Sequence, residues 1–181
     1  MDTLKKVSNL RKAFHLMVKA HNGVYRKFSG VEYAYHPVAV AQIIISRKIS
    51  KHKIKLVIAA LLHDTVEDNP ELVTIELIRE LFGEMVANLV FELTSDPEMI
   101  KIMGKKEYLL MKMLKMTSYG LVIKLADRLH NCRDLVNASD KFRNNYVPQT
   151  RYIINGLADR YLSKTHKGMI REIEELISVH E

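Results

Sequence analysis

Residues 56–68 read LVIAALLHDTVED, and this stretch decides the fold class that we predict for the chain. The segment Ile54–Leu62 is apolar on nearly every side, which is typical of a helix buried in a protein core. Four ionisable residues, His63, Asp64, Glu67 and Asp68, follow within six positions. A buried helix does not normally lead into such a group. The stretch therefore predicts a helical core with a polar site at its end.

The rest of the chain also has helical periodicity. Apolar residues recur at intervals of three and four in Leu4–Val18, and prolines stand at expected first helical positions. We predict one helix that starts at Pro37, another that starts at Pro148, and further helices over 84–93, 96–116, 121–136 and 169–179. A helix over 74–82 is predicted with Thr74 as its N-cap and Gly83 as its C-terminal stop. No stretch alternates convincingly as a strand. The prediction is an all-α bundle of roughly eight to nine helices, forming a single domain over residues 1–181.

Composition narrows the functional class. The chain has 181 residues and a formal net charge of +7, but it has no run of five basic residues and few aromatics for base stacking. This pattern favours a compact anionic ligand over nucleic acid. No apolar run reaches the roughly 18 residues that a membrane span needs, and no secretory signal is visible. With Cys132 as its only cysteine, the chain is expected to be cytoplasmic. The sequence leaves the oligomeric state open.

Three segments contain candidate metal ligands. His63 and Asp64 are adjacent, His36 immediately precedes Pro37, and Asp127 lies in the segment KLADRLHN at 124–131. Two histidines and two aspartates without a thiolate suit Mn²⁺, Fe²⁺, Zn²⁺ or Mg²⁺. Each residue also has an ordinary interpretation: His63 as a hydrogen-bonded core residue, His36 as a cap, and Asp127 as a partner of Lys124 or Arg128. Spacing alone does not decide between the two.

Four blocks of the sequence together resemble one family. They are Ala20-His21-Asn22-Gly23 through Arg26-Lys27-Phe28-Ser29-Gly30; Tyr35-His36-Pro37; Ala59–Asp68; and Ile123–Asn131. In this order they are similar to the HD-domain phosphohydrolases, and more closely to the (p)ppGpp 3′-pyrophosphohydrolase domains of the Rel/Spo family and their small stand-alone relatives. The resemblance extends over about residues 10 to 160.

The resemblance implies a metal-dependent enzyme that cuts the 3′-pyrophosphate from (p)ppGpp and releases GDP or GTP. It implies one metal ion, typically Mn²⁺, and a catalytic pair that positions and deprotonates the attacking water. It also implies a basic pair near the guanine base and further residues facing the ribose and phosphates. The implied metal ligands are His36, His63, Asp64 and Asp127, and the implied catalytic pair is Glu67 and Asp68. The residues implied near the guanine base are Arg26, Lys27 and Ser29. Those implied to face the ribose and phosphates are Lys124, Asn131 and Arg133, with Tyr146 as a weaker candidate.

Two departures from the family pattern leave alternatives open. Asn69-Pro70 stands where relatives often have Thr, and Cys132-Arg133-Asp134 stands where Met-Arg-Thr is common. An added acid near a phosphate site could change specificity. One alternative is an enzyme with the same metal site acting on another nucleotide, such as the 2′-phosphate of NADPH. The other is a nucleotide-binding module without catalysis, against which the intact Glu67–Asp68 pair argues.

Overall fold

The computed structural model describes residues 3–47 and 50–180. Within these ranges the chain is built from helices, and the one β-type pairing is an isolated bridge between Tyr25 and Glu32. The predicted all-α class is confirmed. None of the described helices combines the length and apolarity required to cross a bilayer.

The chain divides into two compact units. The first comprises the residues up to Arg26 together with Gly30–Thr94, and the second comprises Lys27–Ser29 together with the residues from Ser95 onward. The expectation that residues 1–181 act as one domain stays a prediction.

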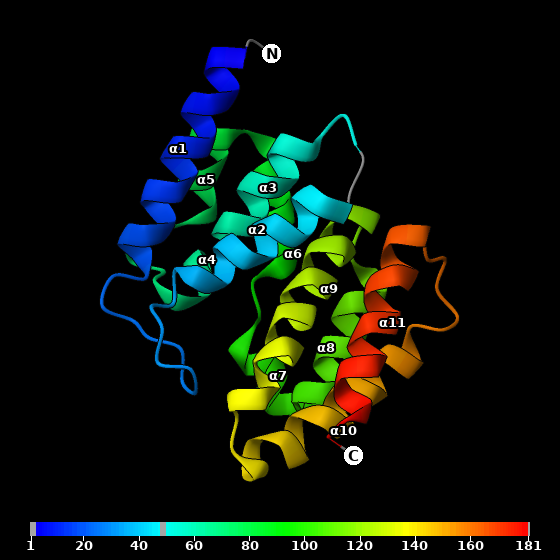
Figure 1. Cartoon of the computed structure of the whole chain (residues 1–181). Coiled ribbons are helices and arrows are strands. Elements are labelled where there is room, and N and C mark those ends of the chain that lie inside the picture. The colour runs from blue at the N-terminus through cyan, green and yellow to red at the C-terminus, as the bar shows by residue number, and fades with distance from the viewer. Residues whose placement is uncertain (1–2, 48–49, 181) are drawn as a thin grey trace. The chain divides into compact units, whose positions relative to one another are not determined.

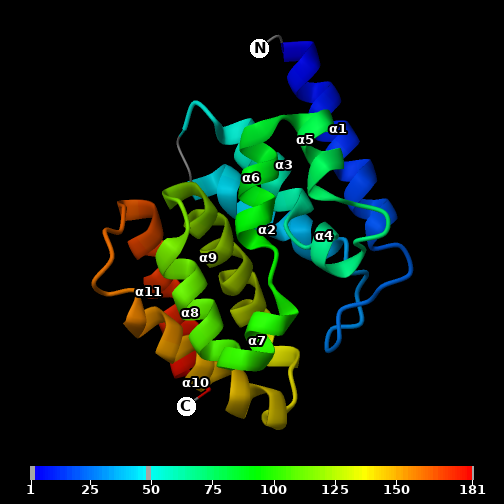
Figure 2. The same cartoon turned by 180° about the vertical axis from the view of Figure 1, so that it is seen from behind.

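The first unit is organised around the helix that the sequence marks as buried. Its helices are α1 (Thr3–Ala20), α2 (Tyr35–Arg47), α3 (Lys53–Leu62), α4 (Thr65–Asp68), α5 (Ile75–Phe82) and α6 (Glu84–Leu93). Helix α3 packs against α1, α2 and α6, and α5 packs against α6 (Figures 1 and 2). Every residue from Leu56 to Leu62 is buried. The end of α3 is therefore held on several sides.

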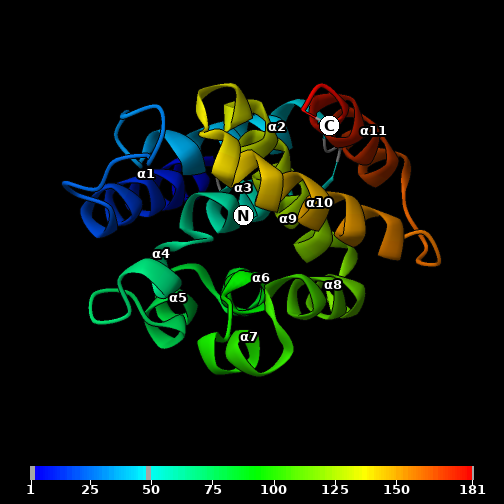
Figure 3. The same cartoon turned by 90° about the horizontal axis from the view of Figure 1, so that it is seen from below.

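The second unit has α9 as its most buried helix. Its elements are α7 (Pro97–Met103), α8 (Lys105–Lys115), α9 (Ser118–Arg133), a 3₁₀ turn η1 (Asp134–Asn137), α10 (Asp140–Gly156) and α11 (Lys164–Ser178). Helix α11 packs against α9, and α10 packs against both α8 and α11 (Figure 3). Arg160 donates hydrogen bonds to the carbonyl oxygens of Met113, Leu114 and Met116, which satisfies the C-terminal end of α8.

Several predicted helix ends are confirmed. The Thr74 hydroxyl accepts a hydrogen bond from the Leu77 N–H at 3.2 Å and caps α5, which ends at Gly83 with φ of +86°. The Asp96 carboxylate caps α7, accepting hydrogen bonds from two backbone N–H groups of its first turn. Pro37 lies within the first turn of α2, where a proline costs no intrahelical bond.

Several predicted helices differ from the structure. The helix expected over 169–179 begins five residues earlier, at Lys164, because the Ser163 hydroxyl caps it by accepting from the His166 N–H. The helix expected over 96–116 is divided by Gly104, whose φ of +81° ends α7 and begins α8. The helix expected to open at Pro148 begins eight residues earlier, at Asp140, because the Ser139 hydroxyl caps it by accepting from the Phe142 N–H. Pro148 therefore lies inside α10. The cap at Ser139, and not the proline, sets the start of this helix.

Candidate metal centre

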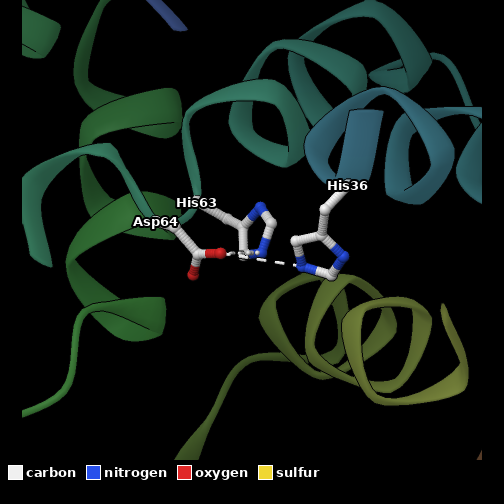
Figure 4. A group of neighbouring side chains, drawn as sticks. All are labelled: His36, His63 and Asp64. Atoms are coloured by element: carbon white, nitrogen blue, oxygen red, sulfur yellow. Dashed lines mark ion pairs between the residues drawn. The ribbon is translucent and has the colours of Figure 1, made fainter. Parts of the chain in front are cut away.

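Three of the predicted metal ligands lie together in the first unit. His36 is in the first turn of α2, and His63 and Asp64 form the turn between α3 and α4. The Asp64 Oδ2 atom is 2.9 Å from His63 Nε2 and 3.6 Å from His36 Nε2 (Figure 4). One donor atom from each residue lies within 4.8 Å of the others. Because α2 packs against α3, the two histidines meet although they are 27 positions apart in the sequence.

The orientation of His63 fits a metal ligand. Its Nδ1 atom lies 2.8 Å from the carbonyl oxygen of Ala60, and since a carbonyl can only accept, Nδ1 carries the proton and donates. In the neutral ring Nε2 then presents a lone pair towards the Asp64 carboxylate. Two electron-rich atoms at 2.9 Å repel unless a positive charge lies between them. A divalent cation supplies that charge, and a backbone partner on the second nitrogen is the usual support of a metal-bound histidine.

Asp64 is held from a second side. The Tyr33 hydroxyl donates a hydrogen bond to Asp64 Oδ2 at 2.8 Å. The Tyr33 ring also lies next to the His36 ring, with centroids 5.7 Å apart, and the Arg26 guanidinium lies 5.8 Å from its centre. The Asp64 side chain is 18% exposed, so the carboxylate is oriented by protein groups and still reachable from solvent. Such oriented ligands lower the reorganisation that metal binding requires.

The predicted catalytic acids follow the cluster by one turn. Glu67 and Asp68 are the last residues of α4, and both are exposed. The helix does not continue unbroken from α3: it stops at Leu62, turns, and resumes as α4, where the Asp68 N–H donates to the Asp64 carbonyl oxygen at 2.9 Å. His63 and Asp64 form this turn with backbone angles that stay in the right-handed helical region. It brings the acid pair next to the histidine–aspartate cluster within one unit.

Two neighbours of the cluster received no role from the sequence. Tyr33 holds Asp64, and His21 Nε2 lies 3.2 Å from Asp68 Oδ2. A signal was available for each: Tyr33 stands three residues before His36, and His21 belongs to the first block of the family pattern. Neither position alone indicates a partner, because both contacts depend on the path of the loop after α1.

The fourth predicted ligand lies in the second unit, on α9. Asp127 Oδ2 is 2.9 Å from the Lys124 Nζ, and Asp127 Oδ1 accepts a hydrogen bond from the Asn131 side-chain amide at 2.7 Å. The ordinary interpretation, a salt bridge to Lys124, is therefore present in the structure. Arg128, the other salt-bridge partner considered for Asp127, is buried and donates a hydrogen bond to the Thr150 hydroxyl at 2.8 Å. A metal-binding role of Asp127 stays a prediction.

The remaining predicted substrate residues are distributed between the units. Arg26 is in the first, whereas Lys27 and Ser29 are in the second, where the intervening Phe28 packs against Phe142. Tyr146 stacks on Phe142 at 5.2 Å between ring centres and lies next to the buried Arg128 guanidinium at 5.3 Å. Arg133 forms a 2.5 Å ion pair with Glu172, so its guanidinium is already engaged by a carboxylate.

Cys132 lies outside the cluster of possible metal ligands that the described residues form. The pKa of its thiol is raised to about 12: burial raises the pKa most, the Arg128 guanidinium lowers it, and the Asp127 carboxylate raises it. The side chain therefore remains a neutral thiol at neutral pH, and a thiolate is the form that binds metals. The possible donor atoms of the cluster of His36, His63 and Asp64 are imidazole nitrogens and a carboxylate oxygen.

Comparisons with known proteins identify the family of the chain. Residues 13–161 match the model of the HD domain. The bifunctional (p)ppGpp synthase/hydrolase SpoT of Escherichia coli is 37% identical over 161 residues, covering 86% of this chain and 22% of that protein. A guanosine-3′,5′-bis(diphosphate) 3′-pyrophosphohydrolase of Spiroplasma citri is 31% identical over 176 residues, covering 94% of this chain and 22% of the relative. The chain thus spans about a fifth of the length of these curated relatives.

Solved structures show the same architecture. A metazoan ortholog of SpoT, described as hydrolysing ppGpp, superposes with a TM-score of 0.79 and 26% identity, covering 99% of this chain and 97% of the other. A protein of Listeria monocytogenes EGD-e shares the fold with a TM-score of 0.66 at 24% identity, covering 82% of this chain and 96% of the other. The resemblance inferred from the sequence blocks is confirmed, and the chain belongs to the HD domain family.

Proposed function

We propose that this chain is a divalent-metal-dependent hydrolase that removes the 3′-pyrophosphate of (p)ppGpp and releases pyrophosphate with GDP or GTP. The observation that carries the proposal is the cluster of His36, His63 and Asp64, followed one turn later by the acid pair Glu67–Asp68. The relatives named for this reaction support the choice of substrate.

The proposed metal ligands are His36, His63, Asp64 and, from the KLADRLHN block, Asp127. A divalent ion bound there polarises a phosphoryl oxygen and lowers the pKa of an attacking water. We assign Mn²⁺ from the family resemblance, since two imidazoles and two carboxylates suit several divalent ions. In this scheme one oxygen of Asp127 contacts the ion in addition to, or in place of, its present partner, Lys124 or Asn131.

Glu67 and Asp68 are assigned to the attacking water. A carboxylate within hydrogen-bond reach of that water accepts its proton as the bond to phosphorus forms, and a second carboxylate orients it. Both side chains are exposed, so a substrate and a water can reach them. A molecule that only bound nucleotides would have no need of such a pair beside its metal ligands.

The anionic substrate requires cations and a base pocket. We assign Arg26, Lys27 and Ser29 to the guanine base, because they match the family's base-binding segment. The ribose and phosphates are assigned to Lys124, Asn131, Arg133 and, with less support, Tyr146. Arginine and lysine can neutralise the charges of the 3′-pyrophosphate. In this scheme the Arg133 guanidinium, which is paired with Glu172 in the present structure, contacts a phosphate.

Two broader expectations belong to the same proposal. The enzyme is proposed to act in the cytoplasm, where guanine nucleotides are available, and residues 1–181 are proposed to form one catalytic domain. The substrate is a small molecule, and no nucleic acid or membrane takes part.

The test is release of pyrophosphate from ppGpp and from pppGpp by the purified protein. One set of reactions contains Mn²⁺, a matched set contains a chelator, and a third offers NADPH in place of the alarmones. Rapid release that the chelator abolishes supports the proposal. Phosphate release from NADPH alone would favour the alternative substrate. Metal and nucleotide binding without any turnover would favour a binding module, and either result would contradict the proposal.

A further inference from the structure

His21 is a buried histidine whose two ring nitrogens both have partners. Its side chain is 0% exposed and lies just beyond the C-terminal end of α1. Nδ1 is 3.0 Å from the Met17 carbonyl oxygen, and Nε2 is 3.2 Å from Asp68 Oδ2. Because a carbonyl only accepts, Nδ1 carries a proton, and the ring is fixed in one orientation.

The contact to Asp68 also requires a proton between Nε2 and the carboxylate, whichever atom carries it. A hydrogen bond to a charged partner is among the stronger side-chain contacts in proteins. The Tyr33 ring lies 4.8 Å from the His21 ring and restricts its movement. The imidazole is therefore held in one orientation with Nε2 facing one oxygen of Asp68. The Asp68 side chain itself is 41% exposed, so it can still meet a ligand.

Helix α4 needs an external support. It contains a single turn, Thr65–Asp68, and a helix of this length has little stability of its own. A second hydrogen bond ties it to the same place on α1: the Asn69 side-chain amide donates to the Ala20 carbonyl oxygen at 3.3 Å. Adjacent residues at the end of α4 are thus held by adjacent residues at the end of α1. Both anchors lie within the first unit.

We propose that His21 is a positioning residue for the reaction: it holds the carboxylate of Asp68 through the Nε2 contact and so sets the geometry of the catalytic acid pair. This inference rests on the proposed function, since it assigns Asp68 to the attacking water. His21 touches neither substrate nor metal and acts through Asp68 alone. A displacement of about 1 Å at a reacting group can cost on the order of 100-fold in rate.

Two substitutions test the contacts of the two ring nitrogens one at a time. His21→Gln places an amide donor near the position of Nε2, so it can keep the bond to Asp68. His21→Asn places its amide near the position of Nδ1, so it can keep the bond to Met17 but is too short to reach Asp68. We expect His21→Asn to lower kcat about 10- to 100-fold with a KM change of less than about threefold. His21→Gln should recover most of that loss.

A matched control exists in the second unit. His166 is also buried, and its Nε2 donates to the Ser118 carbonyl oxygen at 2.9 Å. The substitution His166→Asn removes a comparable buried imidazole without touching the acid pair. It should lower the midpoint of urea unfolding while leaving kcat of the folded protein near the wild-type value.

The decisive experiment combines these variants with Asp68→Asn. In the Asp68→Asn background, His21→Asn should give no further loss of kcat, and the two changes should shift the urea midpoint non-additively. The inference is overturned if His21→Asn turns over like wild type, or if Gln and Asn variants lose kcat equally.

The proposed function fails separately, if the wild type itself releases no pyrophosphate from ppGpp. The inference is then decided by the unfolding midpoints alone. Additive shifts for His21→Asn and Asp68→Asn would overturn it.

Discussion

Asp64 and Asp127 are two largely covered carboxylates with different surroundings. In the first unit Asp64 meets two imidazole rings and a tyrosine hydroxyl. In the second unit Asp127 meets a lysine ammonium at 2.9 Å and an amide at 2.7 Å. A lysine brings a permanent positive charge, whereas a neutral imidazole brings a lone pair. The first arrangement is thus suited to receive a cation, and the second already contains one.

Because of this difference, the support for metal binding is stronger for Asp64 and its two histidines than for Asp127. His36, His63 and Asp64 are brought together by the packing of α2 on α3, and their donor atoms lie close enough together to hold a metal ion. Asp127 has an ordinary salt bridge as a sufficient explanation of its burial. The predictions below test whether the two carboxylates nevertheless act on the same ion.

The largest effect is expected for Asp64→Asn or His63→Ala. Either change removes a donor from the cluster, so metal affinity should fall steeply and turnover should drop by about 10³-fold or more. Calorimetric titration with Mn²⁺ and pyrophosphate release measure the two losses. Far-UV circular dichroism should stay helical. The exposed Glu80→Gln serves as the matched control, and wild-type turnover of Asp64→Asn would remove the metal site from the account.

The next effect is expected for Glu67→Gln. This substitution keeps the shape of the side chain but removes its ability to accept a proton, so kcat should fall about 10²- to 10⁴-fold. Mn²⁺ affinity should be unchanged, because Glu67 lies outside the ligand cluster. If the variant turned over normally, another group would be the base.

A smaller effect on metal affinity separates the two interpretations of Asp127. As a metal ligand, Asp127→Asn should weaken Mn²⁺ binding about 10- to 100-fold. The matched variant Lys124→Met should leave Mn²⁺ affinity near wild type and raise KM. Unchanged Mn²⁺ affinity in Asp127→Asn, together with a lower unfolding midpoint, would make Asp127 a structural salt-bridge residue.

Arg26→Ala tests the proposed base pocket. A hydrogen bond from a charged group contributes about 1.5–3 kcal/mol to binding, so its loss should raise KM about tenfold or more with little change in kcat. Because Arg26 also lies over the Tyr33 ring, Arg26→Lys is the control that keeps the charge there. A KM equal to wild type for Arg26→Ala would place the guanine base elsewhere.

The smallest effect concerns Cys132 and appears only in alkali. Burial raises the pKa of the folded thiol to about 12 from its ordinary value of 9.0, so the unfolded chain loses this proton first as the pH rises. The contribution to stability is therefore complete below pH 9 and is lost between about pH 9 and 12. Urea midpoints should fall less steeply over this range in Cys132→Ala than in wild type. Parallel slopes would contradict the expected burial effect.

Much of the fold could be predicted from the sequence. The uninterrupted apolar segment Leu56–Leu62 indicated the central helix, and local caps such as Thr74 and Asp96 indicated helix starts. These signals are local, so periodicity and capping chemistry suffice to find them. The errors at Gly104 and Pro148 arose where two local signals competed.

The site could be predicted only in part. The adjacent pair His63–Asp64 was visible, and the resemblance connected it to His36. The roles of Tyr33 and His21 could not be inferred, because their contacts join residues 31 and 47 positions apart. Such contacts depend on how α1 and the loop after it pack, which no periodicity encodes.

The most direct test of the central claim is electron paramagnetic resonance of Mn²⁺ added to the wild type and to Asp64→Asn. We predict one tightly bound Mn²⁺ per wild-type chain with magnetic coupling to histidine nitrogens, and no such bound species in Asp64→Asn. Absence of tight binding in the wild type, or a bound ion without nitrogen coupling, would contradict a metal centre built on His36, His63 and Asp64.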